Sequence, residues 1–195
     1  MNKKVGLYFG TFNPFHIGHL IIANHLSQFT DLDEVWLVVT PQSPFKKRSN
    51  LLSNYHRFEL VYRALEGYDH LHVSDVEFNL PQPNYTSLTL AKLAEKHPTN
   101  EFAIIMGEDN LNHFHKWKNY EYILEHHKIY VCPRISKDEI SDAFKNHPKI
   151  VKTDTPIIEI SSTLIRRSIK DGKNVEPLLP TQVWKYVDEM NFYRN

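Results

Sequence analysis

Residues 10–19 read Gly-Thr-Phe-Asn-Pro-Phe-His-Ile-Gly-His, and they stand between an apolar run and a helix-like run. The preceding run, Val5–Phe9, is typical of a buried strand. After the turn residues Gly10 and Pro14, apolar side chains at helical spacing predict a helix over Ile17–Phe29. Free backbone N–H groups and the helix dipole at such a helix start attract anions, so this stretch suits a bound phosphate.

Two histidines of this stretch, His16 and His19, are three residues apart and are expected on one side of the first helical turn. Gly18 between them has no side chain to block a ligand's approach to the backbone. Two isolated histidines near a helix start would more often be a surface feature or a cap. The order of strand, glycine, proline and helix favours a phosphate site instead, as does a second motif late in the chain.

The second motif, residues 160–166, reads Ile-Ser-Ser-Thr-Leu-Ile-Arg. A helix is predicted over Thr163–Lys170, and its N-cap could be Ser161, Ser162 or Thr163. Hydroxyl groups, free N–H groups and the guanidinium of Arg166 would then meet at one helix start and form another anion site. Alone, the motif would be an ordinary capped helix; its presence in the same chain as the first motif makes the pair specific.

The bulk composition is ordinary for a globular chain. Its 195 residues are 41% hydrophobic and 24% charged, and 23 basic residues balance 23 acidic ones. Without net charge, neither nucleic acid nor an anionic membrane is an expected partner, and a ligand's charge must be met locally. Cys132 is the only cysteine, and neither a bilayer-spanning stretch nor a signal peptide is evident, so a cytoplasmic protein is expected. A homo-oligomer remains open.

Strands and helices are predicted to alternate along the chain. Strands are expected over Val5–Phe9, Glu34–Val39, Leu71–Val73, Phe102–Met106, Lys128–Val131 and Lys149–Lys152. Helices are expected over Ile17–Phe29, Asn54–Glu66, Ser87–Lys96, Tyr120–His126, Lys137–Asn146, Thr163–Lys170 and Thr181–Met190. The pattern predicts an α/β fold in a single domain over residues 1–195: a Rossmann-like, doubly wound, mostly parallel sheet with helices on both faces. Ligands of such sheets bind beyond the carboxyl ends of the strands, where both motifs would lie.

Together the two motifs resemble the nucleotidyltransferase superfamily, whose signatures are (T/H)-x-G-H after the first strand and I-S-S-T-x-I-R late in the chain. The resemblance implies that His16, His19 and Arg166 are catalytic, with the histidines on the triphosphate and at the α-phosphorus. The ATP-binding residues that it implies are Gly10, Thr11, Phe12, His16, Gly18, His19, Ile160, Ser161, Ser162, Thr163 and Arg166. Arg134, just past a predicted strand, is added as a further positive charge near the triphosphate.

The middle of the chain is similar to the bacterial nicotinate-nucleotide adenylyltransferases. The similarity is carried by residues 102–111, residues 84–90, and residues 44–47 followed by His56 and Arg57. It implies transfer of the adenylyl group of ATP to nicotinate mononucleotide by direct in-line attack, without a covalent intermediate. ATP is then a co-substrate, and Mg²⁺ is expected on the substrate phosphates rather than on protein ligands. The implied mononucleotide-binding residues are Lys46, Tyr85, Thr86, Gly107, Asp109, Trp117 and Lys118.

These mononucleotide residues also have simpler interpretations. By spacing alone, Trp117 and Phe114 would be core residues. Asp109 could cap a following turn, Thr86 could cap the helix from Ser87, and Lys46 could belong to a solvated loop. For each, the functional interpretation depends mainly on the resemblance.

Three positions depart from the family pattern. Asn13 stands where Asp is usual, which removes a charge and puts a metal or ribose role there in doubt. Phe45 stands where His is often found before the loop lysine. Thr11 stands where a second glycine is common, so its backbone must avoid positive φ.

Other functions are compatible with parts of the sequence. A related transferase could use nicotinamide mononucleotide or phosphopantetheine as the acceptor, although Trp117 favours a pyridine. A non-catalytic nucleotide sensor could share the fold. Four clustered histidines could suggest a metal protein, but their spacing fits no metal-site template and no protein metal ligand is predicted. They are expected at the surface or at helix ends: His113, His115, His126 and His127.

Overall fold

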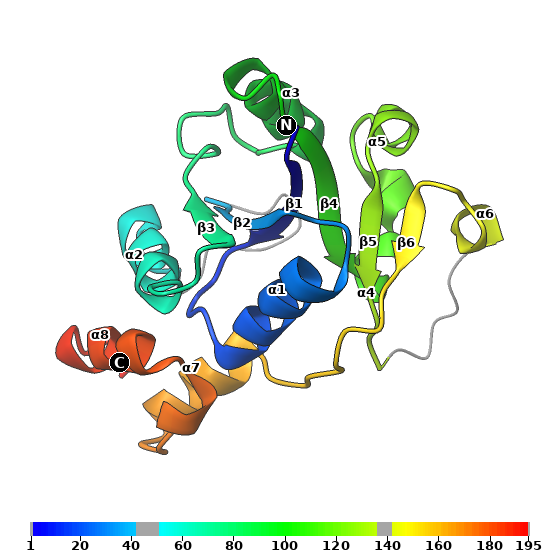
Figure 1. The fold of residues 1–195 in the computed structure, drawn as a ribbon. Helices are drawn as coiled ribbons and strands as arrows, with labels where there is room; N and C mark the ends of the chain where they lie inside the picture. The colour runs from blue at the N-terminus through cyan, green and yellow to red at the C-terminus, as the bar shows by residue number, and fades with distance from the viewer. Residues whose placement is uncertain (1, 42–50, 136–141, 195) are drawn as a thin grey trace.

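A six-stranded parallel sheet forms the centre of the molecule in the computed structural model, which describes residues 2–41, 51–135 and 142–194 (Figure 1). The strands are β1 (Lys4–Gly10), β2 (Glu34–Val39), β3 (Leu71–Ser74), β4 (Glu101–Gly107), β5 (Ile129–Cys132) and β6 (Ile150–Lys152). Their order is β3-β2-β1-β4-β5-β6, and all five pairings are parallel. The predicted α/β, Rossmann-like class is confirmed, with the strand order reversing between β1 and β4.

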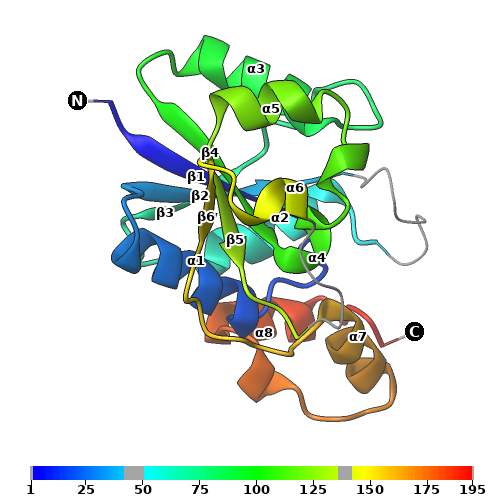
Figure 2. The ribbon, with the colours of Figure 1, turned by 90° about the vertical axis from the view of Figure 1, so that its right-hand side faces the viewer.

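Helices cover both faces of the sheet, as Figure 2 shows. The α-helices are α1 (Ile17–Phe29), α2 (Asn54–Ala64), α3 (Thr86–Lys96), α4 (Glu108–Leu111), α5 (Tyr120–His126), α6 (Asp142–Lys145), α7 (Ser162–Lys170) and α8 (Thr181–Glu189). Within the described residues there are also two short 3₁₀ helices, η1 (Phe114–Lys116) and η2 (Glu176–Leu178). No helix within the described ranges is long and apolar enough to cross a membrane.

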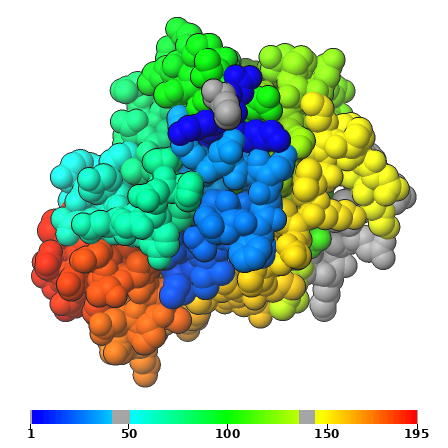
Figure 3. Space-filling view, viewed as in Figure 1, coloured from blue at the N-terminus to red at the C-terminus, as the bar shows by residue number. Residues whose placement is uncertain are grey.

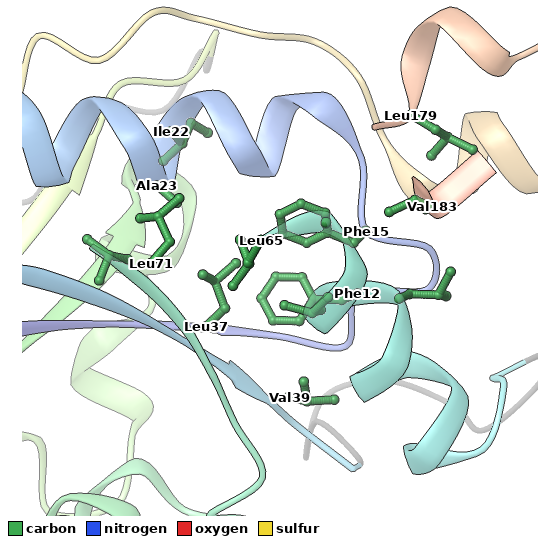
Figure 4. Packing of buried hydrophobic residues seen from close by; sticks show 14 of the residues in the cluster. Phe12, Phe15, Ile22, Ala23, Leu37, Val39, Leu65, Leu71, Leu179 and Val183 are labelled. Carbon is green, nitrogen blue, oxygen red and sulfur yellow. The ribbon is translucent and has the colours of Figure 1, made fainter. Parts of the chain in front are cut away.

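The core consists of two apolar clusters, one on each side of the sheet. Alternate residues of β2 separate into them: Val35, Leu37 and Val39 face α1, α2, α7 and α8, whereas Val38 faces α3 and α5. The first cluster also holds the rings of Phe12 and Phe15, which follow β1 (Figure 4). These two buried rings anchor the loop between β1 and α1 to the core.

The predicted elements match the structure closely, with a few differences. The bounds of α1, β2 and α5 are those predicted, and α2 ends at Ala64 rather than Glu66. Three short elements, α4, η1 and η2, were not predicted, because segments of three or four residues carry no periodicity. The predicted helix over Lys137–Asn146 falls partly outside the described residues, and α6 covers Asp142–Lys145.

Candidate active site

His16 and His19 meet where β1 gives way to α1. His16 is the N-cap of α1, one residue before the helix rather than in its first turn, and its ring stacks on that of His19 with centroids 3.6 Å apart. The backbone N–H of His16 donates to Nδ1 of His19 over 3.2 Å. A neutral His19 that accepts at Nδ1 carries its proton on Nε2, so that nitrogen is a hydrogen-bond donor.

The ring of His16 is kept neutral by its surroundings. It is 5% exposed. Burial, supported by the positive charge of Arg134, lowers the pKa of His16 to about 4. At neutral pH His16 therefore brings an uncharged ring to the site.

Gly18 packs closely against the ring of His16. A Cβ atom on Gly18 would lie 3.1 Å from Nδ1 of His16 and 3.2 Å from a methyl group of Ile158. This is a reason for the glycine that the sequence did not reveal. Nearby, Thr11 avoids positive φ as predicted, and Phe12 adopts the left-handed conformation instead, with φ of 45°.

The second motif is joined directly to the first. Ser161 is the N-cap of α7, and its hydroxyl accepts a hydrogen bond from the N–H of Leu164 over 3.2 Å. Ser162 donates from Oγ to the carbonyl of Pro14 over 2.9 Å, and Arg166 donates from Nη1 to the carbonyl of Asn13 over 2.7 Å. The start of α7 is thereby fixed beside the start of α1.

A pocket of about 690 Å³ lies at the carboxyl ends of β1 and β4, between these two helix starts. It includes all the predicted site residues that the structure describes. From the predicted ATP site these are Gly10, Thr11, Phe12, His16, Gly18, His19, Arg134, Ile160, Ser161, Ser162, Thr163 and Arg166. From the predicted mononucleotide site they are Tyr85, Thr86, Gly107, Asp109, Trp117 and Lys118. Lys46 and Phe45 lie outside the described residues.

An aromatic wall closes the pocket on the side of α3 and η1. Trp117 is half-buried and packs edge-on against Phe114, with ring centroids 5.4 Å apart. Phe114 is fully buried and belongs to the core, whereas Trp117 packs against that core and also lines the pocket. Lys118 places its ammonium 4.6 Å from the ring centre of Tyr85. Tyr85 is the N-cap of α3, so the alternative in which Thr86 caps that helix is wrong.

Gly107, Asp109 and Arg134 form the end of the pocket beyond β4. A Cβ atom on Gly107 would collide with the carboxylate of Asp109 and lie 3.0 Å from Nε of Arg134. The Arg134 Nε and an Asp109 oxygen are 4.0 Å apart. Gly107, not Asp109, is the N-cap of α4, so the capping interpretation of Asp109 is wrong and its carboxylate remains at the pocket.

The charges that line the pocket are mostly positive. Lys116, Lys118, Arg134 and Arg166 face two acidic residues, Asp109 and Glu77. Burial raises the pKa of Glu77 above its ordinary value. The pocket therefore favours an anionic ligand although the whole chain is neutral.

Sequence reasoning missed Glu77, Asn84 and Lys116 as pocket residues. Glu77 is 2% exposed and accepts from the hydroxyl of Thr89 over 2.8 Å, while Asn84 donates to the Glu77 carbonyl over 3.1 Å. A buried acid inside an irregular segment leaves no periodic signal, so only the fold reveals it. Lys116 lies two residues from Lys118, which was the one clue available in the sequence.

The candidate metal cluster of histidines does not form among the described residues, where no group of three or more His, Cys, Asp or Glu side chains could hold a metal ion. His126 ends α5 and bonds through Nδ1 to the carbonyl of Tyr122, and His127 follows as the C-cap. Both are helix-end histidines, as predicted.

Comparisons with known proteins identify relatives over the whole length of the chain. A family model described as cytidylyltransferase-like matches residues 7–168. A relative from Christiangramia forsetii, named "probable nicotinate-nucleotide adenylyltransferase", is 64% identical over 100% of both chains. A relative of the same name from Flavobacterium johnsoniae is 59% identical over 98% of this chain and 99% of its own.

A solved structure supports the fold. The Plasmodium falciparum nicotinic acid mononucleotide adenylyltransferase, complexed with NaAD, superposes with a TM-score of 0.78 and covers 98% of each chain. At 18% sequence identity this likeness concerns the fold alone.

Proposed function

This chain belongs to the cytidylyltransferase-like family and, within it, to the nicotinate-nucleotide adenylyltransferases, and we propose that it adenylylates nicotinate mononucleotide. The products are nicotinate adenine dinucleotide and pyrophosphate. The proposal depends on one observation: two helix N-termini suited to phosphate binding, those of α1 and α7, lie beside one pocket lined mostly by positive charges. Two hydrogen bonds, from Ser162 and Arg166, connect the start of α7 to the loop before α1. The names of full-length relatives supply the identity of the acceptor.

The proposed reaction needs no protein nucleophile. A 5′-phosphate oxygen of the mononucleotide attacks the α-phosphorus of ATP, and the bond from that phosphorus to the β-phosphate bridging oxygen breaks as pyrophosphate leaves. Catalysis then consists of positioning the two phosphates and stabilising the charge that develops on them. Both tasks suit hydrogen-bond donors and cations fixed on rigid helix starts.

The geometry supports a proposed role for each of four residues. His19 donates from Nε2 to the α-phosphate, because its Nδ1 is occupied by the His16 N–H. His16, uncharged and stacked on His19, orients that ring and the phosphate chain. Arg166 and the N–H groups at the start of α7 hold the departing pyrophosphate, and Arg134 adds charge near the triphosphate.

The aromatic wall suits the pyridine ring of the acceptor. Trp117 offers a flat, half-buried face for stacking. The N–H groups at the start of α3, near Thr86, and the ammonium of Lys118 suit the nicotinate carboxylate. Asp109 can accept a hydrogen bond from a ribose hydroxyl, and Lys46 is proposed for the acceptor phosphate.

Mg²⁺ is proposed to enter with ATP. Asp109 is the only carboxylate lining the described pocket apart from the buried Glu77, which fits a metal held mostly by phosphate oxygens and water. When bound, the ion would neutralise phosphate charge. We assign it no protein ligand.

The proposed function is tested by pyrophosphate release with ATP, Mg²⁺ and one of three acceptors. We expect fast release with nicotinate mononucleotide and much slower release with nicotinamide mononucleotide or phosphopantetheine. Equal rates with both pyridine nucleotides would widen the substrate class. Activity with phosphopantetheine alone would overturn the assignment. A lack of activity with all three acceptors would also overturn it.

A further inference from the structure

Asn13 joins four separate parts of the chain just before the histidine pair. Its side chain is almost fully buried, and Oδ1 accepts hydrogen bonds from the N–H of Leu52 over 3.2 Å and from the hydroxyl of Tyr193 over 2.8 Å. Its backbone carbonyl accepts from Arg166 of α7 over 2.7 Å. One residue thus links its own loop to the segment before α2, to α7 and to the chain after α8.

Tyr193 is brought to Asn13 by an uncommon backbone path. The chain turns after α8 through Asn191, whose φ of 53° is usual for an asparagine just past a helix end. Tyr193 itself has φ of 66°, a conformation that a bulky aromatic residue rarely adopts. Figure 3 shows the red and orange surface of this C-terminal part adjoining the cyan and blue surface of the N-terminal third. Strain of this kind persists only where the surroundings fix it, and it often marks a functional site.

The Tyr193 hydroxyl lies close to the charges of the proposed phosphate site. Burial raises the pKa of Tyr193, and the positive charges of Arg166 and Arg57 act in the opposite direction. The hydroxyl therefore stays protonated and donates to Asn13. Tyr193 and Arg166 both donate to Asn13, Tyr193 to its side-chain oxygen and Arg166 to its backbone carbonyl.

The loop that Tyr193 holds would not keep its shape by itself. Phe12, next to Asn13, has φ of 45°, and the carbonyl of Thr11 is held by the guanidinium of buried Arg57 over 2.8 Å. A loop in a rarely populated conformation needs such external contacts on both sides. Arg57 supplies the contact before Phe12, at Thr11, and Tyr193 supplies the contact after it, at Asn13.

We propose that Tyr193 is a positioning residue of the ATP site. Through its hydrogen bond to Asn13, it holds the loop between β1 and His16 in the position at which Arg166 also bonds to that loop. This inference rests on the proposed function. It makes the C-terminal segment part of the phosphate-binding machinery, although Tyr193 itself touches no substrate.

The test compares Tyr193→Phe with Tyr186→Phe. The matched control, Tyr186 of α8, also has a bonded hydroxyl, 2.9 Å from Nδ1 of His56, but the described contacts of that hydroxyl do not reach the loop. We expect Tyr193→Phe to weaken ATP binding about three- to tenfold in calorimetry and to lower kcat by a similar factor, as the loss of one hydrogen bond implies. The KM for nicotinate mononucleotide and the melting temperature should change no more than in Tyr186→Phe.

A double-mutant cycle tests whether Asn13 carries the effect. In an Asn13→Ala background, Tyr193→Phe should have little further effect on ATP affinity, because its acceptor is gone. An undiminished effect in that background, or equal ATP affinities for Tyr193→Phe and Tyr186→Phe, would overturn the proposal. ATP binding needs no acceptor substrate, so wild-type protein that binds ATP but does not adenylylate nicotinate mononucleotide would contradict only the proposed function.

Discussion

At the scale of single residues, the candidate site depends on two stacked histidine rings and on one hydrogen bond from the backbone of His16 to the ring of His19. The sequence predicted that His16 and His19 would face the same way, because three residues separate them on a helix. It could not predict that the N–H of His16 would occupy Nδ1 of His19, since that depends on the extended backbone of His16 at the N-cap. This contact assigns the proton of His19 to the nitrogen that can serve a phosphate.

Replacing His19 should remove turnover and leave the fold intact. We expect His19→Ala to lower kcat by about 100- to 1,000-fold, the usual effect of losing one donor to a developing oxyanion. The pyrophosphate-release assay measures the rate, and circular dichroism checks the fold. His25→Ala is the control, because His25 lies on the same helix and bonds to Asp154 away from the pocket. Near-normal turnover of His19→Ala would exclude the proposed role.

His16 should make the protein less stable in acid. Its pKa is about 4 in the folded state and about 6.5 when unfolded, so the unfolded chain binds the proton first as the pH falls. The free energy of unfolding should be unaffected by His16 above pH 6.5 and should fall by about 2–3 kcal/mol between pH 7 and pH 4.5 on its account.

Urea denaturation of wild type and His16→Gln at these two pH values measures this contribution. Other groups titrate equally in both proteins, so only the difference between their pH dependences is informative. The variant should lose less stability in acid than the wild type. Parallel losses would show that His16 does not titrate as its burial implies.

At the scale of secondary structure, long periodic elements were predictable and short irregular ones were not. The apolar patterns of β1 and α1 placed the first motif correctly, and Ser161 was among the three predicted caps of α7. The short helix α4 and the turn η1, which bring Asp109 and Trp117 to the pocket, could not be predicted. Their positions depend on where β4 ends in the sheet, which is a tertiary property.

Glu77 illustrates a contact between elements that has a measurable pH signature. Its carboxyl group is buried near α3, where it accepts a hydrogen bond from the hydroxyl of Thr89 over 2.8 Å. Burial raises the pKa of Glu77 above 4.5, so its ionisation in the folded state opposes folding. The contribution of Glu77 to the free energy of unfolding is most favourable below pH 4.5 and is lost as the pH rises through the folded-state pKa.

We therefore expect Glu77→Gln to be at least as stable as the wild type at pH 8. The glutamine keeps an acceptor for Thr89 and cannot ionise. Denaturation in urea at pH 5 and pH 8 should show a smaller decline for the variant, while the exposed Glu125→Gln on α5 should follow the wild type. A large loss of stability for Glu77→Gln at pH 8 would mean that the buried group acts as a charged carboxylate.

At the scale of the whole molecule, the strand order brings chain segments that are far apart in sequence to one edge of the sheet. Alternation of strands and helices was enough to predict the class and the edge at which ligands bind. It could not reveal the ties that hold the edge together, such as the bond from Tyr193 to Asn13 across 180 residues. That residues 1–195 form a single domain remains a prediction.

Arg57 joins several segments at this edge through five hydrogen bonds from one side chain. It is 1% exposed, and burial lowers its pKa to about 10, so it remains charged at neutral pH. Its guanidinium donates to carbonyl oxygens in the β1–α1 loop and at both ends of the β2–α2 connection, and to the side-chain oxygen of the first residue of α2; the acceptors are Thr11, Thr40, Pro41, Leu52 and Asn54. All five acceptors are neutral, so the cation is stabilised by dipoles from several segments rather than by a carboxylate.

Only a planar guanidinium group, with several N–H donors, can reach these oxygens together. Replacing Arg57 with lysine should therefore destabilise the fold although the positive charge is kept. We expect Arg57→Lys to lower the free energy of unfolding by about 2–4 kcal/mol, because a single ammonium leaves buried carbonyls without donors. The half-exposed Arg63 of the same helix pairs with Glu59, and Arg63→Lys should cost about 0.5 kcal/mol or less. Equilibrium urea denaturation compares the two variants. Equal small losses would mean that the loops at this edge hold their shape without Arg57, whereas a large loss confined to Arg57→Lys would show that one buried cation stabilises the edge on which the proposed site is built.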